Sequence, residues 1–369
     1  GDNVIHLAGG SFNTAASRSV LAGLGIENPI DVAADAAITT TNPAALVEWH
    51  IASNTIGGSG KITFRNDALA KNSHFMPQLS GSGATFVPGP IEIANGVDGT
   101  TALHSYNGAG TTQTFNHVIS GTGSYTRNAT APNTGGTTVF TAANTYSGGT
   151  DVSRGTLLVN NTTGSGTGSG AVTVGSSGML GGTGRIGGAV TNGGVISPGA
   201  SIGTLTVNSD VSMSAGSRLA IEVSETTADR LVVHGDLDLS AMEFLDVTGS
   251  GTGPWLIATY DGSLMGVFNQ VTAGFVVDYA TNGQILLNVA PPPGDYNSDG
   301  KVDAADYVVW CKSPELNGGV TTGYDTWRTN FGRSSNGSGG LADEDVAVPE
   351  PAGFVLLLGL SVLLLVRGR

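Results

Sequence analysis

Near the end of the chain, Asp295 to Asp306 form a twelve-residue stretch whose acidic side chains are spaced like the ligands of a hard metal ion. Ca²⁺ takes about six to eight oxygen ligands, and a loop of this length supplies them from positions 1, 3, 5, 7, 9 and 12. The sixth position needs a sharp turn, and Gly300 occupies it. The spacing therefore predicts a Ca²⁺ site, with an acidic surface loop as the alternative. The predicted ligands are Asp295, Asn297, Asp299, the carbonyl of Lys301, Asp303 and Asp306.

The residues that follow the loop point to a known type of module. Position 12 is Asp306, the next residues are Tyr307-Val308-Val309-Trp310, and this unit resembles the loop–helix unit of type I dockerins. Dockerins carry two such units, and Tyr324-Asp325-Thr326-Trp327 repeats the Tyr-x-x-Trp pattern. However, Gly323 stands where the second loop would need its Asp, and Asn317-Gly318-Gly319-Val320 lacks the Asp series. The resemblance implies two helices packed through Tyr and Trp and a single calcium loop, so a cohesin-like partner is not expected.

The loop opens a small module with clear borders. Residues 291–294 are three prolines and a glycine, which predicts a stiff spacer because proline donates no backbone hydrogen bond. The module is expected to span residues 295–332, followed by a Gly/Ser-rich and acidic linker over residues 333–347. Cys311 is the only cysteine, so no disulfide can form within the chain, and an inert thiol on the first helix is expected.

The last residues, 348–369, combine a short motif, an apolar run and a basic end. Pro349-Glu350-Pro351 precedes the apolar run Ala352 to Val366, and two arginines follow it. As a helix this run would be about 22 Å long, short of the roughly 30 Å hydrocarbon core of a bilayer. The layout resembles a PEP-CTERM sorting signal. That resemblance implies export, transient anchoring in the membrane by a C-terminal hydrophobic helix, and removal of the tail by an exosortase-type enzyme; a plain tail anchor is the alternative.

Residues 1–290 share another texture. Short runs such as residues 61–64, 171–174 and 204–207 alternate apolar and polar side chains, which is typical of β-strands, and they lie between clusters of Gly, Ser, Thr and Asn. Such short strands bury a face only when they stack as coils of a solenoid. The pattern predicts an all-β fold, a parallel β-helix or solenoid over residues 1–290, with a β-sandwich as the alternative.

Within this region, residues 138–207 resemble the autotransporter-associated β-strand repeat, also called the passenger-associated transport repeat. The resemblance implies a β-helical, passenger-like surface domain, although no β-barrel translocator follows it in this sequence. The segments that carry it are Asn144-Thr145-Tyr146-Ser147-Gly148-Gly149-Thr150, Gly155-Thr156-Leu157-Leu158-Val159-Asn160, Gly168-Ser169-Gly170-Ala171-Val172-Thr173-Val174, Leu180-Gly181-Gly182-Thr183-Gly184 and Ser197-Pro198-Gly199-Ala200-Ser201-Ile202-Gly203-Thr204-Leu205.

Motifs that would indicate catalysis are weak. Residues 182–187 match G-x-G-x-x-G, but no helical pattern follows, so they are predicted to be a solenoid turn. The six histidines have no metal-ligand spacing. We therefore expect no enzymatic activity; the alternative is a surface-displayed β-helix lyase or glycoside hydrolase that degrades polysaccharides. Its carboxylates would have to come from the dense acidic region made up of Asp229, Asp236, Asp238, Glu243 and Asp246.

Composition limits the remaining classes. The chain has 369 residues, 58 of them Gly, and a formal net charge of -14. An acidic chain without a basic stripe is a poor nucleic-acid binder, since that affinity depends on neutralising phosphates. The sequence as a whole predicts an exported, bacterial-type protein of the cell surface or extracellular matrix, with a structural or adhesive role and extracellular polysaccharide as a candidate partner.

Overall fold

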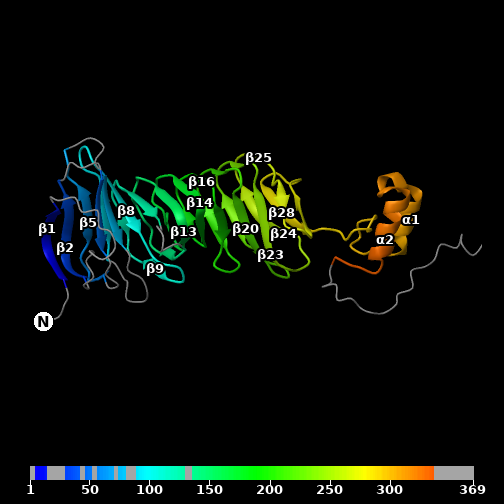
Figure 1. Ribbon diagram of the computed structural model, residues 1–369, viewed down its shortest axis with the longest axis horizontal. Coiled ribbons are helices and arrows are strands. Elements are labelled where there is room, and N and C mark those ends of the chain that lie inside the picture. Colours follow the sequence, from blue (N-terminus) through cyan, green and yellow to red (C-terminus); the bar gives the residue numbers. More distant parts are fainter. Residues whose placement is uncertain are drawn as a thin grey trace, which may run out of the picture. The chain divides into compact units, whose positions relative to one another are not determined.

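The computed structural model describes residues 5–14, 30–41, 46–51, 56–69, 74–79, 89–128 and 135–335. The chain divides into two compact units, one made of Gly1–Thr272 with Val277–Leu287 and the other of Ala273–Val276 with Asn288–Arg369. In the first unit, strands follow one another as stacked coils in sequence order (Figure 1). The described part of the chain thus confirms the predicted β-solenoid.

Strands of the described residues form three sheets of six, sixteen and six strands. The first consists of β1 (Ile5–Thr14), β2 (Ile30–Thr40), β4 (Ile56–Gly57), β5 (Ile62–Asn66), β7 (Ile91–Ala94) and β10 (Ile119–Ser120). The second consists of β3 (Leu46–Ile51), β6 (His74–Leu79), β8 (Thr100–Ser105), β9 (Thr112–Phe115), β11 (Ser124–Arg127), β12 (Thr137–Phe140), β13 (Thr150–Val159), β14 (Val172–Gly182), β16 (Val190–Asn192), β17 (Val195–Pro198), β19 (Val211–Met213), β20 (Arg218–Val223), β22 (Leu237–Leu239), β23 (Phe244–Gly249), β25 (Leu264–Gly266) and β26 (Gln270–Val271). The third consists of β15 (Arg185–Ile186), β18 (Thr204–Val207), β21 (Arg230–Val233), β24 (Trp255–Tyr260), β27 (Phe275–Asp278) and β28 (Gln284–Val289).

Parallel pairing in register places similar residues of successive coils above one another. Val172, Val190, Val211 and Leu237 follow each other along one column, and each side chain is at most 1% exposed. A buried aliphatic side chain of this size contributes about 1.5–3 kcal/mol, so such columns hold the coils together. The residues that follow each of them point outward, which explains the alternation seen in the sequence.

The first third of the solenoid follows the same rule. The sequence assigns residues 1–137 to the solenoid mainly by their general texture, without a clear repeat. The structure confirms parallel coils in the described part of this region. There, Ile62 pairs with Ile91 and Ile91 with Ile119, and all three side chains are buried. The strands of this part therefore belong to the same solenoid as the repeat.

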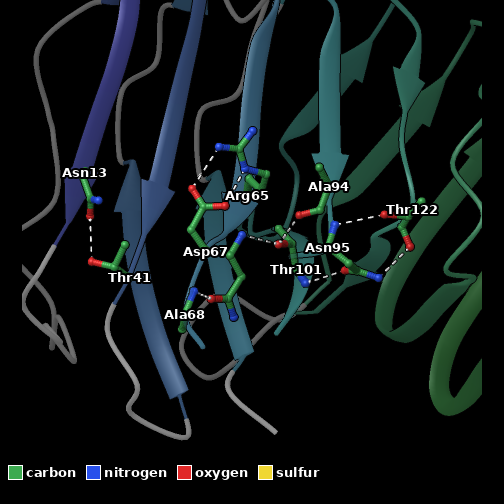
Figure 2. A network of polar contacts seen from close by, with 10 residues as sticks. Asn13, Thr41, Arg65, Asp67, Ala68, Ala94, Asn95, Thr101 and Thr122 are labelled. Atoms are coloured by element: carbon green, nitrogen blue, oxygen red, sulfur yellow. Dashed lines mark hydrogen bonds and ion pairs between the residues drawn. The ribbon is translucent and has the colours of Figure 1, made fainter. Parts of the chain in front are cut away.

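Side-chain hydrogen bonds join neighbouring coils where strands end (Figure 2). Asn95 Nδ2 donates to the carbonyl of Thr122 (2.9 Å), and the backbone N–H of Asn95 donates to Thr122 Oγ1 (3.0 Å). Thr101 N–H donates to Asn95 Oδ1 (2.8 Å), and Thr101 Oγ1 donates to the carbonyl of Ala94 (2.7 Å). These bonds satisfy backbone groups that the sheets leave unpaired at the corners.

One corner buries an arginine. Arg127 is fully buried and donates to four backbone carbonyls, and the shortest of these bonds reach Gly136 (2.6 Å) and Asn128 (2.7 Å). A Cβ at Gly155 would lie 2.6 Å from Arg127 Nη2, and the φ of Gly155 is +72°, so glycine is required there. The longer bonds go to the carbonyls of Ser105 and Asn107. Arg127 thus ties successive coils together through their backbone.

The C-terminal end of the third sheet changes direction. Strand β28 pairs antiparallel with β24, where Trp255 faces Leu287 and both side chains are buried. Trp255 also donates its indole N–H to the carbonyl of Ser224 (2.9 Å). The last coil is therefore covered by a strand that returns against it.

Glu243 is also buried, but unlike Arg127 its charged group forms no ion pair and no well-formed hydrogen bond among the described residues. The backbone N–H groups of Ala241 and Glu243 lie near enough to favour its charged form, although burial outweighs them. Within the same described residues, Ser217 Oγ on the preceding coil also lacks a partner. Burial raises the pKa of the Glu243 carboxyl. A carboxyl whose pKa is raised on folding holds its proton more tightly in the folded state. The free energy of unfolding therefore falls as the pH rises from the ordinary carboxyl range through that raised pKa.

We expect Glu243→Gln to stabilise the solenoid at pH 7, by about 1 kcal/mol or more, because the amide carries no charge to desolvate. At pH 4, where the carboxyl is protonated, variant and parent should unfold at similar urea concentrations. Urea unfolding at both pH values checks this, with Glu222→Gln as a control at an exposed carboxylate of the same region. Equal midpoints for Glu243→Gln and its parent at pH 7 would contradict the prediction.

The second unit contains short helices. These are α1 (Ala304–Lys312), a 3-10 turn (Pro314–Leu316), a π-helical turn (Gly319–Gly323) and α2 (Tyr324–Asn330). Helix α1 begins where Asp303 caps it and ends at Ser313, whose backbone N–H returns to the carbonyls of Val309 and Trp310. The predicted pair of helices after the loop is thus present.

Candidate metal centre

The predicted calcium loop is a closed turn that leads into α1. Ser298 and Gly300 both have positive φ, 60° and 88°, which reverses the chain at positions 4 and 6 of the loop. On its far side the loop pairs with the chain that follows α2, since Val302 N–H donates to the carbonyl of Arg333 (2.8 Å) and the carbonyl of Val302 accepts from Gly332 N–H (2.8 Å). Val302 itself is fully buried. The loop therefore has a fixed shape.

The side chains at positions 1, 3 and 5 organise the turn. Asp295 accepts the backbone N–H groups of Asp299 (3.2 Å) and Gly300 (2.8 Å), one on each oxygen. Asn297 Oδ1 also accepts from Asp299 N–H (2.9 Å), and Asp299 Oδ1 accepts from Lys301 N–H (3.0 Å). These contacts hold the first half of the loop around its own carboxylates.

Position 12 closes the loop. Asp306 is fully buried, and its Oδ1 accepts the N–H groups of Tyr296 (2.7 Å) and Asn297 (3.0 Å). Its Oδ2 accepts from Asp303 N–H (2.8 Å), while Asp303 Oδ1 accepts from Ala305 N–H (2.7 Å). The bond from Asp303 N–H to Asp306 is one half of a capping box at the start of α1, and the other half is the Asp303 side chain, which accepts the backbone N–H of Asp306. Asp306 thus joins the end of the loop to its beginning.

The chemistry of this donor set fits a calcium ion. Six oxygen donors lie within twelve residues, and an ionised carboxylate has about four lone-pair sites, of which the backbone N–H groups use only some. Asp295 and Asp306 are buried without an ion pair among the described residues. In the described part of the chain, however, no three His, Cys, Asp or Glu side chains converge in an arrangement that could hold a metal ion. Calcium ligation by these residues therefore stays a prediction.

At Gly323, where the dockerin-like pattern would need a second Asp, the structure leaves no room for a side chain. A Cβ at Gly323, the position that matches Asp306, would lie 2.1 Å from the carbonyl oxygen of Asn317 and 2.6 Å from Trp310 Nε1. The π-helical turn and these contacts occupy the space that a ligand side chain would need. No acidic residue can stand there unless this backbone moves.

Aromatic residues pack α1 against α2, as the sequence predicts. The ring of Tyr307 lies 4.9 Å from that of Trp327 and 5.5 Å from that of Trp310. Trp327 is buried, and its indole N–H donates to the carbonyl of Asp303 (2.7 Å) at the end of the loop. Tyr296 O–H donates to the carbonyl of Gly323 (2.6 Å). The aromatic core is thus bonded directly to the loop. Cys311, on α1, is free and exposed.

Only part of the acidic region shares a site: Asp229 and Asp246 line one pocket together with Glu222, whereas Asp236, Asp238 and Glu243 are not among the residues that line it. Asp229 is buried and accepts the N–H groups of Gly203 and Glu222, and Glu243 is buried in the core. Asp236 accepts the backbone N–H of Ser263 on the following coil, Asp238 accepts that of Ser240 in its own turn, and Asp246 pairs with Arg218. The region that carries these residues continues the solenoid through β20 to β24. The segment 182–187 lies across the end of β14 and β15, which confirms the predicted turn.

The histidines are equally dispersed in the described residues. His6 contacts Asp31 (3.0 Å), and His234 contacts Asp261 (2.6 Å). His104 is buried, which lowers its pKa to about 4. Sequence reasoning missed that Arg127 and Glu243 are buried, because a single sequence does not show which corners of a solenoid face inward.

Two predicted segments cannot be described structurally. Most of the linker 333–347 and the whole tail 348–369 lie outside the described residues. Within the described ones, no helix has the length and apolar character needed to cross a membrane.

Comparison with known proteins adds no relative. The chain matches no protein-family model, and it matches no curated protein.

Proposed function

We propose that this chain is an exported structural or adhesive protein of the cell surface or extracellular matrix. The observation that carries the proposal is the stack of parallel coils, in which outward residues such as Thr126, Asp151 and Thr173 repeat at each coil. A solenoid of this kind offers a long, regular surface rather than one deep cleft. That form suits attachment to an extended partner.

The loop Asp295 to Asp306 is proposed to bind Ca²⁺, which would order the module that follows the solenoid. Four aspartates repel one another within twelve residues, with Lys301 as the only basic side chain among them. A divalent cation would offset this repulsion, and binding at about 100 times the dissociation constant would stabilise the module by about 2.7 kcal/mol. High extracellular calcium would then favour the folded module.

The tail 348–369 is proposed to act as a sorting signal that an exosortase-type enzyme removes after export. The support for this step is its sequence alone, namely the Pro-Glu-Pro motif, the apolar run and the terminal arginines. Before processing, the apolar helix would hold the protein in the membrane.

Localisation of tagged protein with and without residues 348–369 tests this function. In a host that has the sorting enzyme, we expect the full chain at the surface and the truncated chain released into the medium. Intact mass of the surface form should show the loss of the residues beyond about Pro349. Surface retention of both forms, or a surface peptide that ends at Arg369, would contradict the sorting step.

A further inference from the structure

A polar groove of about 480 Å³ lies on the outer face of the third sheet. It crosses β15, β18 and β21 and is bordered by the turn after β13. None of its described lining residues is Phe, Tyr or Trp. The groups that line it include Thr162, Thr183, Arg185, Thr204, Arg230 and His234.

Register brings the two arginines to the same outward surface. Arg185 pairs with Thr206 on β18, and Arg230 on β21 pairs with Thr204. Adjacent strands lie about 4.8 Å apart. Arg185 and Arg230 stand on β15 and β21, which are separated by the single strand β18. Threonine hydroxyl groups lie between and beside them.

Neither arginine is neutralised by a neighbouring carboxylate. Arg185 and Arg230 form no ion pair among the described residues, and Arg230 Nε is buried without a hydrogen-bond partner. Asp229 is next to Arg230 in sequence, but both its oxygens accept backbone N–H groups. Asp261 is not among the residues that line the groove, and it is hydrogen-bonded (2.6 Å) to His234, which is among them. The groove is thus a cationic concavity on a chain of net charge -14.

We propose that this groove binds an acidic polysaccharide, with Arg185 and Arg230 pairing with its carboxylate or sulfate groups. Planar guanidinium groups bind such oxyanions through two parallel hydrogen bonds. The hydroxyl groups of Thr183 and Thr204 suit sugar hydroxyls. Nucleic acid fits less well, since the acidic chain repels a closely charged backbone and no aromatic ring is present for base stacking. The inference rests on the proposed adhesive role and names its partner.

Calorimetry on the full chain with a galacturonate hexamer tests the proposal. We expect binding that weakens with added salt, and at least about tenfold weaker binding for the Arg185→Gln/Arg230→Gln variant, since each charged pair is worth about that factor. The matched control is Arg154→Gln, which removes an exposed charge from β13 outside the groove and should bind like the parent. The fully methyl-esterified hexamer, which has no charge, should not bind.

Several outcomes would overturn the proposal. They are absence of binding at millimolar hexamer, equal binding of the esterified hexamer, equal binding by the double variant, or equally tight binding of single-stranded DNA. Circular dichroism shows whether the double variant is folded, and if it is not, Arg185→Gln alone replaces it because Arg185 is exposed. Calcium binding and localisation do not depend on this groove, so its failure leaves the tests of the proposed function unaffected.

Discussion

Asp306→Ala is expected to abolish calcium binding and to unfold the module around α1 and α2. Asp306 is the ligand predicted at position 12, so its loss removes a charged donor, and we expect the dissociation constant for Ca²⁺ to rise at least about 100-fold. Independently of metal, three backbone N–H groups, those of Tyr296, Asn297 and Asp303, lose their acceptor. Each hydrogen bond to a charged group is worth about 1.5–3 kcal/mol, so the apo module should lose several kcal/mol as well.

Two measurements separate these effects. Calorimetry on chelator-treated full chain reports calcium binding, and near-ultraviolet circular dichroism reports the packing of Trp310 and Trp327 in the aromatic core. Asp325→Ala, an exposed acid on α2 outside the loop, is the control and should behave like the parent. Calcium binding by Asp306→Ala with parental affinity would show that the ligand assignment is wrong. Absence of any calcium heat from the parent at millimolar concentration would show the same.

Arg127→Met is expected to destabilise the solenoid by about 3 kcal/mol or more. Methionine fills much of the same volume but removes four hydrogen bonds from a charged donor, each worth about 1.5–3 kcal/mol. The carbonyls of Ser105 and Gly136 keep a backbone donor, the N–H groups of Asn128 and Thr156, whereas those of Asn107 and Asn128 lose the Arg127 donor. Arg127→Lys should recover only part of the loss, because an ammonium group does not reproduce the planar fork. The expected effect is therefore ordered, with the parent most stable, then lysine, then methionine.

Urea unfolding monitored by far-ultraviolet circular dichroism checks this order. Arg154→Met is the matched control, since Arg154 lies exposed on the neighbouring β13 and its replacement should shift the midpoint little. Equal midpoints for Arg127→Met and Arg154→Met would mean that the carbonyls around Arg127 find water or another donor instead.

The strands of the solenoid could be predicted because burial repeats with a period of two. The runs at 171–174 and 204–207 correspond to β14 and β18, and their inward residues are the buried ones. Alternation assigns each residue to one face of a strand, and stacking requires that face to be apolar. The same argument places the acidic region after residue 207 in the solenoid, although this region lies beyond the segment that resembles the repeat.

Corners of the coils could not be predicted in this way. The sequence pattern does not show that Arg127 and Glu243 are fully buried. Whether the Arg127 side chain turns inward depends on carbonyls of the preceding coil. One of these belongs to Ser105, which lies 22 residues before Arg127 in the sequence. A local pattern contains no information about that contact.

For the candidate metal site, spacing alone gives the positions of the predicted ligands, and calcium binding by them stays a prediction. Its six positions follow from the order of Asp and Asn, and the loss of the second loop follows from Gly323. The reason why glycine is needed at position 323 cannot be predicted from the sequence. A Cβ there would clash with the carbonyl oxygen of Asn317 and with the indole of Trp310. Nor does the sequence show that Asp306 is bonded to the first residues of the loop.

The register of the solenoid also bears on how its length can change in evolution. Asp151 pairs with Thr126 on the preceding coil and Thr173 on the following one, and the same holds along the stack. Since each coil meets only its two neighbours, a duplicated or deleted coil need be compatible with just those two. Duplication or deletion of a coil that preserves the apolar column could therefore lengthen or shorten the solenoid. The loop Asp295 to Asp306 and the C-terminal sequence would stay unchanged.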